Sequence, residues 1–173
     1  MHRHPARVMT IIALLCFGLL LPLGGALAQQ KTLKEQLVGA WTLVSIDSAA
    51  PDGTKQQPYG ANPKGILILD TSGQYALETG IPDRPKFNAT NNVRSAATAE
   101  EWAVAARGFS ANFGTWSVNE ADKTLIRKYE IALIPNNDGM ELKASVSLTG
   151  DALKLTVTPA AGGRFETVYR QAK

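Results

Sequence analysis

Short runs of alternating apolar and polar residues, separated by turn residues, dominate the sequence from residue 39 onward. Successive side chains of a β-strand point to opposite faces, so this alternation indicates strands with one buried face and one solvated face. The runs recur at roughly the 8 to 12 residue spacing that is typical of antiparallel sandwiches and barrels. The pattern therefore predicts an all-β fold whose strands follow one another as a meander.

Eight strands are expected. We place them at residues 39–47, 65–70, 74–79, 109–119, 124–134, 140–149, 153–158 and 164–170. The segments between them contain Gly, Asn, Asp and Pro, which tolerate the backbone of tight turns. Because a sheet of eight strands can hide its apolar face by closing on itself, the sequence predicts an eight-stranded antiparallel barrel, with either a filled core or room for one small ligand.

The insertion at residues 80–108 departs from the strand pattern. Its first part has no periodicity, whereas residues 98–107 predict one short helix, with a capping box formed by Thr98 and Glu101. We expect this helix to cover an end or edge of the barrel. Trp102 on the helix is expected to plug the barrel, because a large aromatic side chain more often packs than gates. The alternative is that the insertion forms a lid over a pocket.

Residues 1–28 have the order of features that characterises a secretory signal peptide. Arg3 and Arg7 provide a basic start, an apolar run follows, and the Ala-Leu-Ala sequence at 26–28 supplies a cleavage site. Proline and glycine interrupt the apolar run before the roughly 20 residues that a membrane span needs. We therefore expect cleavage after residue 28, a periplasmic or secreted protein, and no stable membrane span after cleavage.

Cleavage would leave one domain at residues 29–173 and would remove His2, His4 and Cys16, so the mature domain would contain neither histidine nor cysteine. It would also lower the number of Lys and Arg residues from 18 to 16, against 15 acidic residues. Without histidine and cysteine we expect no disulfide, no metal and no cofactor. The nearly balanced charges, with no basic stripe, argue against binding of nucleic acid.

Side chains that face the interior of such a barrel are predicted from their position in the alternation. In the later strands one set of alternate residues is apolar, and the residues between them are polar. We predict a small hydrophobic or amphipathic ligand inside the barrel. The predicted lining residues are Tyr75, Leu77, Phe113, Arg127, Tyr129, Met140, Leu142 and Phe165.

The order of motifs resembles that of the lipocalin-like domain proteins of bacteria. Residues 37–45, Leu-Val-Gly-Ala-Trp-Thr-Leu-Val-Ser, resemble the Gly-x-Trp strand that opens these domains. The Gly-Thr-Trp-Ser-Val sequence at 114–118, followed by residues 125–136, resembles their central hairpin, and residues 150–156 and 168–170 resemble their last strands. The resemblance covers most of the expected mature chain and implies a calycin-like barrel.

The same resemblance implies that Trp41 packs at the closed end of the barrel against an arginine of the last strand, for which Arg170 is the candidate. The chain departs from the family pattern in one strand, where positions that often carry histidine hold Arg127 and Lys128. A guanidinium does not exchange a proton near neutral pH as histidine does, so a histidine-dependent activity is not expected. Trp116 has polar neighbours in the alternation and is expected outside.

Two orientations of Arg127 are open. Its position in the alternation matches that of Tyr129 and points into the barrel, where the charge would need a carboxylate or an anionic ligand. The favoured alternative is an arginine near the end of its strand, whose aliphatic stem carries the charge to solvent. Basic residues of the insertion would also suit an anionic head group, but a solvated loop is favoured for them.

Three classes of function remain, of which binding leads. An enzyme of the isomerase or cyclase type is less favoured, because the strand carboxylates Glu78 and Glu130 are expected to be exposed. The sequence contains no nucleophile motif, paired carboxylates or phosphate-binding loop, so no catalytic residue is predicted. The third class is a barrel filled by its own side chains that interacts with partners through its surface.

Overall fold

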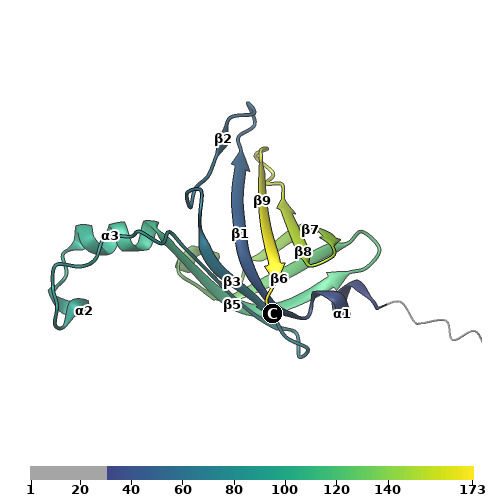
Figure 1. The fold of residues 1–173 in the computed structure, drawn as a ribbon, viewed down its shortest axis with the longest axis horizontal. Coiled ribbons are helices and arrows are strands. Elements are labelled where there is room, and N and C mark those ends of the chain that lie inside the picture. Colours follow the sequence, from purple (N-terminus) through teal and green to yellow (C-terminus); the bar gives the residue numbers. More distant parts are fainter. Residues whose placement is uncertain (1–30) are drawn as a thin grey trace, which may run out of the picture. The chain divides into compact units, whose positions relative to one another are not determined.

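The structure is a computed structural model, and it describes residues 31–173. The signal peptide predicted at residues 1–28 lies outside the described residues. Eight strands form the barrel, each antiparallel to the next, and pairing of the first with the last closes it (Figure 1). They are β1 (Gly39–Ala49), β3 (Lys64–Leu69), β4 (Gln74–Gly80), β5 (Phe109–Asn119), β6 (Thr124–Ala132), β7 (Glu141–Thr149), β8 (Ala152–Val157) and β9 (Arg164–Gln171). The predicted eight-stranded antiparallel barrel is confirmed.

The predicted helix is also confirmed as α3 (Ala99–Arg107), with the Thr98 side chain and the Glu101 carboxylate forming the expected capping box. Four short elements were not predicted, because segments of two to five residues show no usable periodicity. These are α1 (Leu33–Leu37), β2 (Lys55–Gln56), α2 (Val93–Ala96) and the 3₁₀ turn η1 (Pro135–Asn137).

Helix α1 lies across one end of the barrel, which we call the closed end. Its first two backbone N–H groups, those of Leu33 and Lys34, donate to the carboxylate of Glu120 at 2.9 Å. Glu120 belongs to the turn between β5 and β6, so a carboxylate distant in sequence satisfies donors that a helix start leaves free and complements its positive end. The contact fixes α1 to the base of the barrel.

Trp41 packs directly above α1. It is 1% exposed, and its indole Nε1 donates to the carbonyl of Leu37, itself completely buried, at 2.8 Å. The expected position of Trp41 at the closed end is confirmed, but its expected arginine partner is wrong. Arg170 lies on the outer face, where its Nε is 3.8 Å from a carboxylate oxygen of Asp151. The α1 backbone, and not a guanidinium, therefore satisfies this tryptophan.

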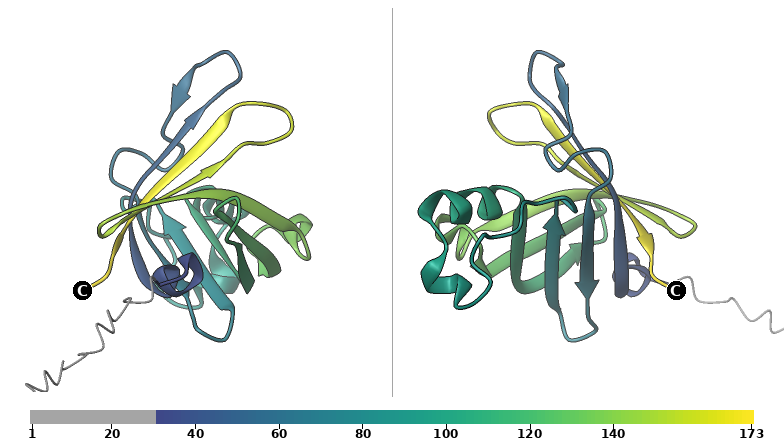
Figure 2. Two further views of the ribbon diagram at one scale, coloured as in Figure 1. Left: turned by 90° about the vertical axis from the view of Figure 1, so that its right-hand side faces the viewer. Right: turned by 60° about the vertical axis from the view of Figure 1, so that its left-hand side comes forward.

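At the opposite end, which we call the open end, β1 changes partners along its length. Residues 39–42 of β1 pair with β3, whereas Ser48 and Ala49 pair with β2. Beyond Thr42, therefore, β1 and β3 no longer pair. Figure 2 shows the β1–β2 and β8–β9 hairpins projecting together, away from the remaining strands.

A β-bulge between β5 and β6 redirects side chains in the wall of the barrel. Gly114 pairs with Tyr129 but Phe113 pairs with Ile131, so Glu130 is the extra residue. Gly114 and Tyr129 face the interior, and Phe113 and Ile131 lie on the outer face with 42% and 54% of their surface exposed. The extra residue therefore places Tyr129 and Ile131, which are two residues apart and would otherwise share a face, on opposite faces of the sheet.

The insertion between β4 and β5 forms an arm that carries α2 and α3 beyond the ends of these strands (Figure 1). Trp102 packs against Phe87 of the same insertion, with the rings tilted at 54° and their centroids 4.9 Å apart, and is 41% exposed. The expectation that Trp102 plugs the barrel is therefore wrong. The guanidinium carbon of Arg84 lies 4.9 Å from the ring centroid of Phe109, which connects the arm to the start of β5.

Candidate functional site

The candidate site lies inside the barrel around Arg127 of β6. The strand register places Arg127 between Trp116 of β5 and Leu142 of β7. Arg127 is only 6% exposed, so the favoured expectation that its charge reaches solvent is wrong. Trp116, which was expected outside, is 4% exposed, and its Nε1 donates to the carbonyl of Asp70 at 3.1 Å. Both side chains are therefore part of the interior.

The charge of Arg127 is not balanced by any described residue. Arg127 is the only buried charged side chain within residues 31–173, and no ion pair of that segment includes it. Its Nε and Nη1 atoms are buried and have no hydrogen-bond partner there. The guanidinium carbon lies 5.5 Å from the ring centroid of Tyr75. This contact attracts the cation but leaves N–H donors without an acceptor.

Tyrosines form the polar surroundings of Arg127. The rings of Tyr75 and Tyr129 are tilted at 48° with centroids 6.4 Å apart, and the Tyr75 hydroxyl is buried without a partner. Burial raises the pKa of Tyr75 well above its usual range and that of Tyr169 to about 12, while the positive charge of Arg127 opposes both shifts. Both hydroxyls therefore stay protonated near neutral pH and can donate hydrogen bonds.

Polar interior positions continue from this layer toward the open end. Asn112 of β5 pairs with Leu77 of β4, and its Oδ1 is buried without a partner. Sequence reasoning missed Asn112 because hydrophobicity is inverted at two positions of β5, where the apolar Phe113 is outside and the polar Asn112 is inside, whereas Trp116 follows the usual rule. One signal for the inversion was present: the Gly-x-Trp order at 114–116 repeats that at 39–41, where the tryptophan faces inward.

Seven of the eight predicted lining residues lie at interior positions. The deeper ones are Tyr75, Leu77, Arg127, Tyr129 and Leu142, all buried or half-buried. Met140 and Phe165 occupy interior positions at the open end and are 52% and 44% exposed. The structure places the eighth, Phe113, on the outer face, away from the other seven.

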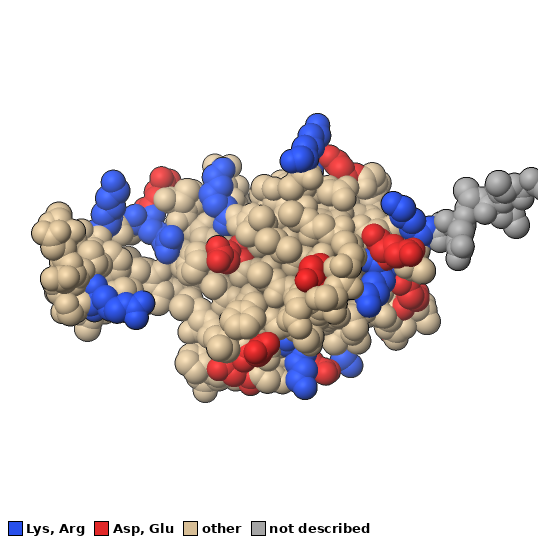
Figure 3. Space-filling model, turned by 90° about the horizontal axis from the view of Figure 1, so that it is seen from below, with Lys and Arg blue, Asp and Glu red and all other residues tan. Residues whose placement is uncertain are grey.

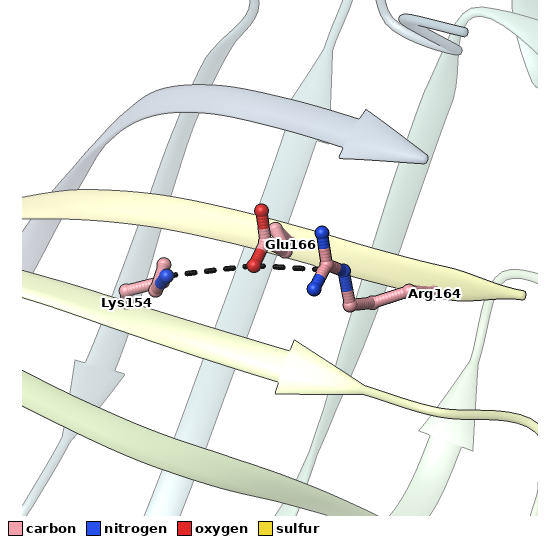
Figure 4. A network of polar contacts seen from close by, with 3 residues as sticks. All are labelled: Lys154, Arg164 and Glu166. Atoms are coloured by element: carbon pink, nitrogen blue, oxygen red, sulfur yellow. Dashed lines mark hydrogen bonds and ion pairs between the residues drawn. The ribbon is translucent and has the colours of Figure 1, made fainter. Parts of the chain in front are cut away.

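Charged side chains of both signs are interspersed on the outer face shown in Figure 3. On β8 and β9, one oxygen of Glu166 lies 3.4 Å from Lys154 Nζ and 3.6 Å from Arg164 Nε (Figure 4). This network borders a hollow of about 560 Å³ between β2 and β9. Glu78 and Glu130 are exposed, as expected. The strand carboxylates thus lie outside the barrel and do not contribute to the interior site.

The described part of the chain contains no cluster of three or more side chains suited to hold a metal ion. No helix within residues 31–173 has the length and apolar character needed to cross a bilayer.

Comparisons with known proteins agree with this architecture at the level of the family. Residues 38–170 match the model of a lipocalin-like domain. No curated protein sequence matches the chain.

Among solved structures, the chain is similar to a de novo designed fluorescence-activating β-barrel, with 9% identity, 82% of this chain and 99% of that chain covered, and a TM-score of 0.40. It is also similar to a mutant of the fluorescent protein UnaG, with 12% identity, coverage of 80% and 97%, and a TM-score of 0.35. Since the family model extends from the residue before β1 to the last but one residue of β9 and so includes all eight barrel strands, the chain belongs to the family of lipocalin-like domains.

Proposed function

We propose that the protein binds a small hydrophobic or amphipathic molecule in the open half of the barrel. The observation that carries the proposal is the exposure of Met140 and Phe165, two large apolar side chains at interior positions of the open end. Side chains at interior positions of a filled barrel are normally covered by their neighbours. A ligand that enters from this end would remove both side chains from water, at a gain of roughly 25 cal/mol for each Å² of apolar surface buried.

The interior near the closed end also favours entry of a ligand from the open end. Leu67, Leu69, Leu125 and Leu153 are completely buried near the closed end, so packed side chains fill that half. The interior also contains polar groups of Tyr75, Asn112 and Arg127, on the neighbouring strands β4, β5 and β6, that have no partner among the described residues. A ligand with an apolar part and a polar part would therefore match both kinds of surface in the interior.

A matched pair of phenylalanines tests the proposed site. Phe165 at an interior position and Phe113 on the outer face have nearly equal exposure, 44% and 42%. We expect Phe165→Glu to weaken binding of the neutral fluorescent probe N-phenyl-1-naphthylamine at least tenfold, because a carboxylate would then border the apolar part of the site. Tenfold corresponds to about 1.4 kcal/mol of binding free energy. Fluorescence titration of the purified protein measures this change.

The Phe113→Glu variant is the control and should bind the probe as the unchanged protein does. Absence of saturable probe fluorescence with the unchanged protein would contradict the proposed function. Equal weakening by both substitutions would place the probe outside the barrel and would also contradict it.

We further propose that the protein is exported and acts in the periplasm or outside the cell. The basic, apolar and small-residue segments of residues 1–28 support this proposal. The mass of the full-length protein expressed in a bacterium and recovered from the periplasmic fraction tests it. A mass that corresponds to cleavage after Ala28 is expected, and an uncleaved protein found only in the cytoplasm would refute the export.

A further inference from the structure

We propose that the ligand of the barrel is a monoanion, of the carboxylate class, whose charged group pairs with the guanidinium of Arg127. This inference deepens the binding function proposed above and rests on it. It assigns the polar end of the ligand to the layer of Trp116, Arg127 and Leu142, and the apolar end to the open end of the barrel.

The charge of Arg127 is not balanced by any described residue. The Arg127 side chain is only 6% exposed, so its guanidinium loses most of its hydration, and burial of an unpaired charge is among the most costly features of a folded protein. Arg127 has no carboxylate partner within the described chain, and two of its nitrogens have no acceptor. A bound anion would supply both the countercharge and the acceptors.

The single buried charge and its planar shape favour a carboxylate. Arg127 is the only buried charged group in residues 31–173, so a ligand with one negative charge would leave the interior neutral, whereas a dianion would leave an excess charge. The planar guanidinium presents its donors in pairs that match the two oxygens of a carboxylate. A monocarboxylate therefore fits better than a phosphate monoester.

The neighbours of Arg127 favour the same class of ligand. The buried hydroxyl of Tyr75 has no partner, stays protonated at neutral pH and belongs to a ring that lies beside the guanidinium. It can therefore donate a second hydrogen bond to the anion. Tyr129 and Leu142, which border Arg127, are only half-buried, so both side chains remain accessible to a molecule beside the guanidinium.

Two probes that share a chain and differ in charge test the inference. Dodecanoate and dodecanol are titrated into the purified protein, and their dissociation constants are compared by calorimetry. We expect the unchanged protein to prefer dodecanoate at least tenfold. Arg127→Met should reduce the preference to less than threefold while keeping the affinity for dodecanol, because methionine fills the site without a charge.

Lys128→Met is the matched control. Lys128 follows Arg127 on the same strand but is exposed on the outer face, so its substitution removes one positive charge without altering the interior. The dodecanoate preference of this variant should equal that of the unchanged protein. Arg127→Lys retains the charge but not the paired donors, and should show an intermediate preference.

Thermal unfolding without ligand separates a binding role of Arg127 from a structural one. If the residue is kept for binding, Arg127→Met should melt at the same temperature as the unchanged protein or higher, since it removes a buried unpaired charge. A lower melting temperature together with an unchanged probe preference would overturn the inference.

The possible outcomes distinguish this inference from the proposed function. Equal binding of dodecanoate and dodecanol by the unchanged protein would overturn the carboxylate assignment and leave the binding function standing. Binding of neither probe would overturn both. If Arg127→Met does not fold, the intermediate preference expected for Arg127→Lys still decides the matter, and full retention of the preference by that variant would refute the pairing.

Discussion

Replacing Trp41 with alanine is expected to lower the free energy of unfolding by about 4 kcal/mol, a large part of the 5–15 kcal/mol typical of a domain. The side chain is 1% exposed and lies at the centre of the closed end, where its Nε1 donates to the Leu37 carbonyl. The substitution leaves a cavity under the barrel and an unpaired carbonyl on α1. Urea unfolding followed by circular dichroism measures the loss.

Two further variants identify the cause of this loss. Trp41→Phe keeps most of the apolar volume but removes the indole donor, so it should cost less than Trp41→Ala. Trp102→Ala is the control, because Trp102 is 41% exposed and packs on Phe87 within the arm. It should change the free energy of global unfolding by less than about 1 kcal/mol. An equal cost for Trp41→Ala and Trp102→Ala would contradict the closed-end packing described above.

Replacing Gly114 with alanine is expected to cost about 3 kcal/mol or to prevent folding. A Cβ atom at Gly114 would collide with the backbone oxygen of Lys128 and would lie 2.7 Å from the backbone nitrogen of Glu130. Both atoms belong to the bulged strand β6 that pairs with β5. The backbone cannot yield without loss of this pairing, so the clash is not relieved by a change of side-chain rotamer.

Gly139→Ala separates this clash from the general cost of losing a glycine. Gly139 has a φ of +79°, and nothing lies within 4 Å of the position that a Cβ atom would take there, so its substitution strains the backbone but meets no atom. It should cost about 1 kcal/mol. Urea unfolding of both variants compares them, and a loss for Gly114→Ala no greater than that for Gly139→Ala would show that the bulge accommodates a side chain.

The strands and the helix α3 could be predicted from sequence because their signals are local. Alternation with a period of two residues marks each strand, and the capping box of Thr98 and Glu101 marks the start of α3. The closure of the barrel followed from the number of strands and the lack of another partner for their apolar faces.

The position of Arg127 could not be predicted, because it depends on depth along the barrel axis and not on alternation. Alternation correctly indicated that Arg127 is on the inner side of the sheet. It did not indicate the depth: an inward arginine near the open end would reach water, whereas one near the middle of the barrel does not. The bulge at Gly114 and the packing partner of Trp102 could not be predicted from alternation either. Each is set by contacts between segments that the sequence pattern does not relate to one another.

Phe113 and Asn112 show why hydrophobicity alone misplaces a binding surface. In most strands the apolar residue is the buried one, and the assignment of faces depends on that rule. At these two positions of β5 the apolar residue is outside, and the polar residue is the one with a buried, unpartnered oxygen. A site built for a polar group reverses the usual pattern, so such inversions are a useful sign of function in barrels of this kind.

The closure of the barrel through β1 and β9 has a consequence for how the chain folds. The two strands pair from Trp41 with Gln171 to Ala49 with Arg164, so the last contacts join residues from opposite ends of the domain. Domains with such high contact order fold slowly, in milliseconds to seconds. Until β9 pairs with it, one edge of β1 is free, with the apolar Val44 beside it, and is exposed to pairing with other chains. Pairing of β9 with β1 is therefore the step that covers this edge of the sheet.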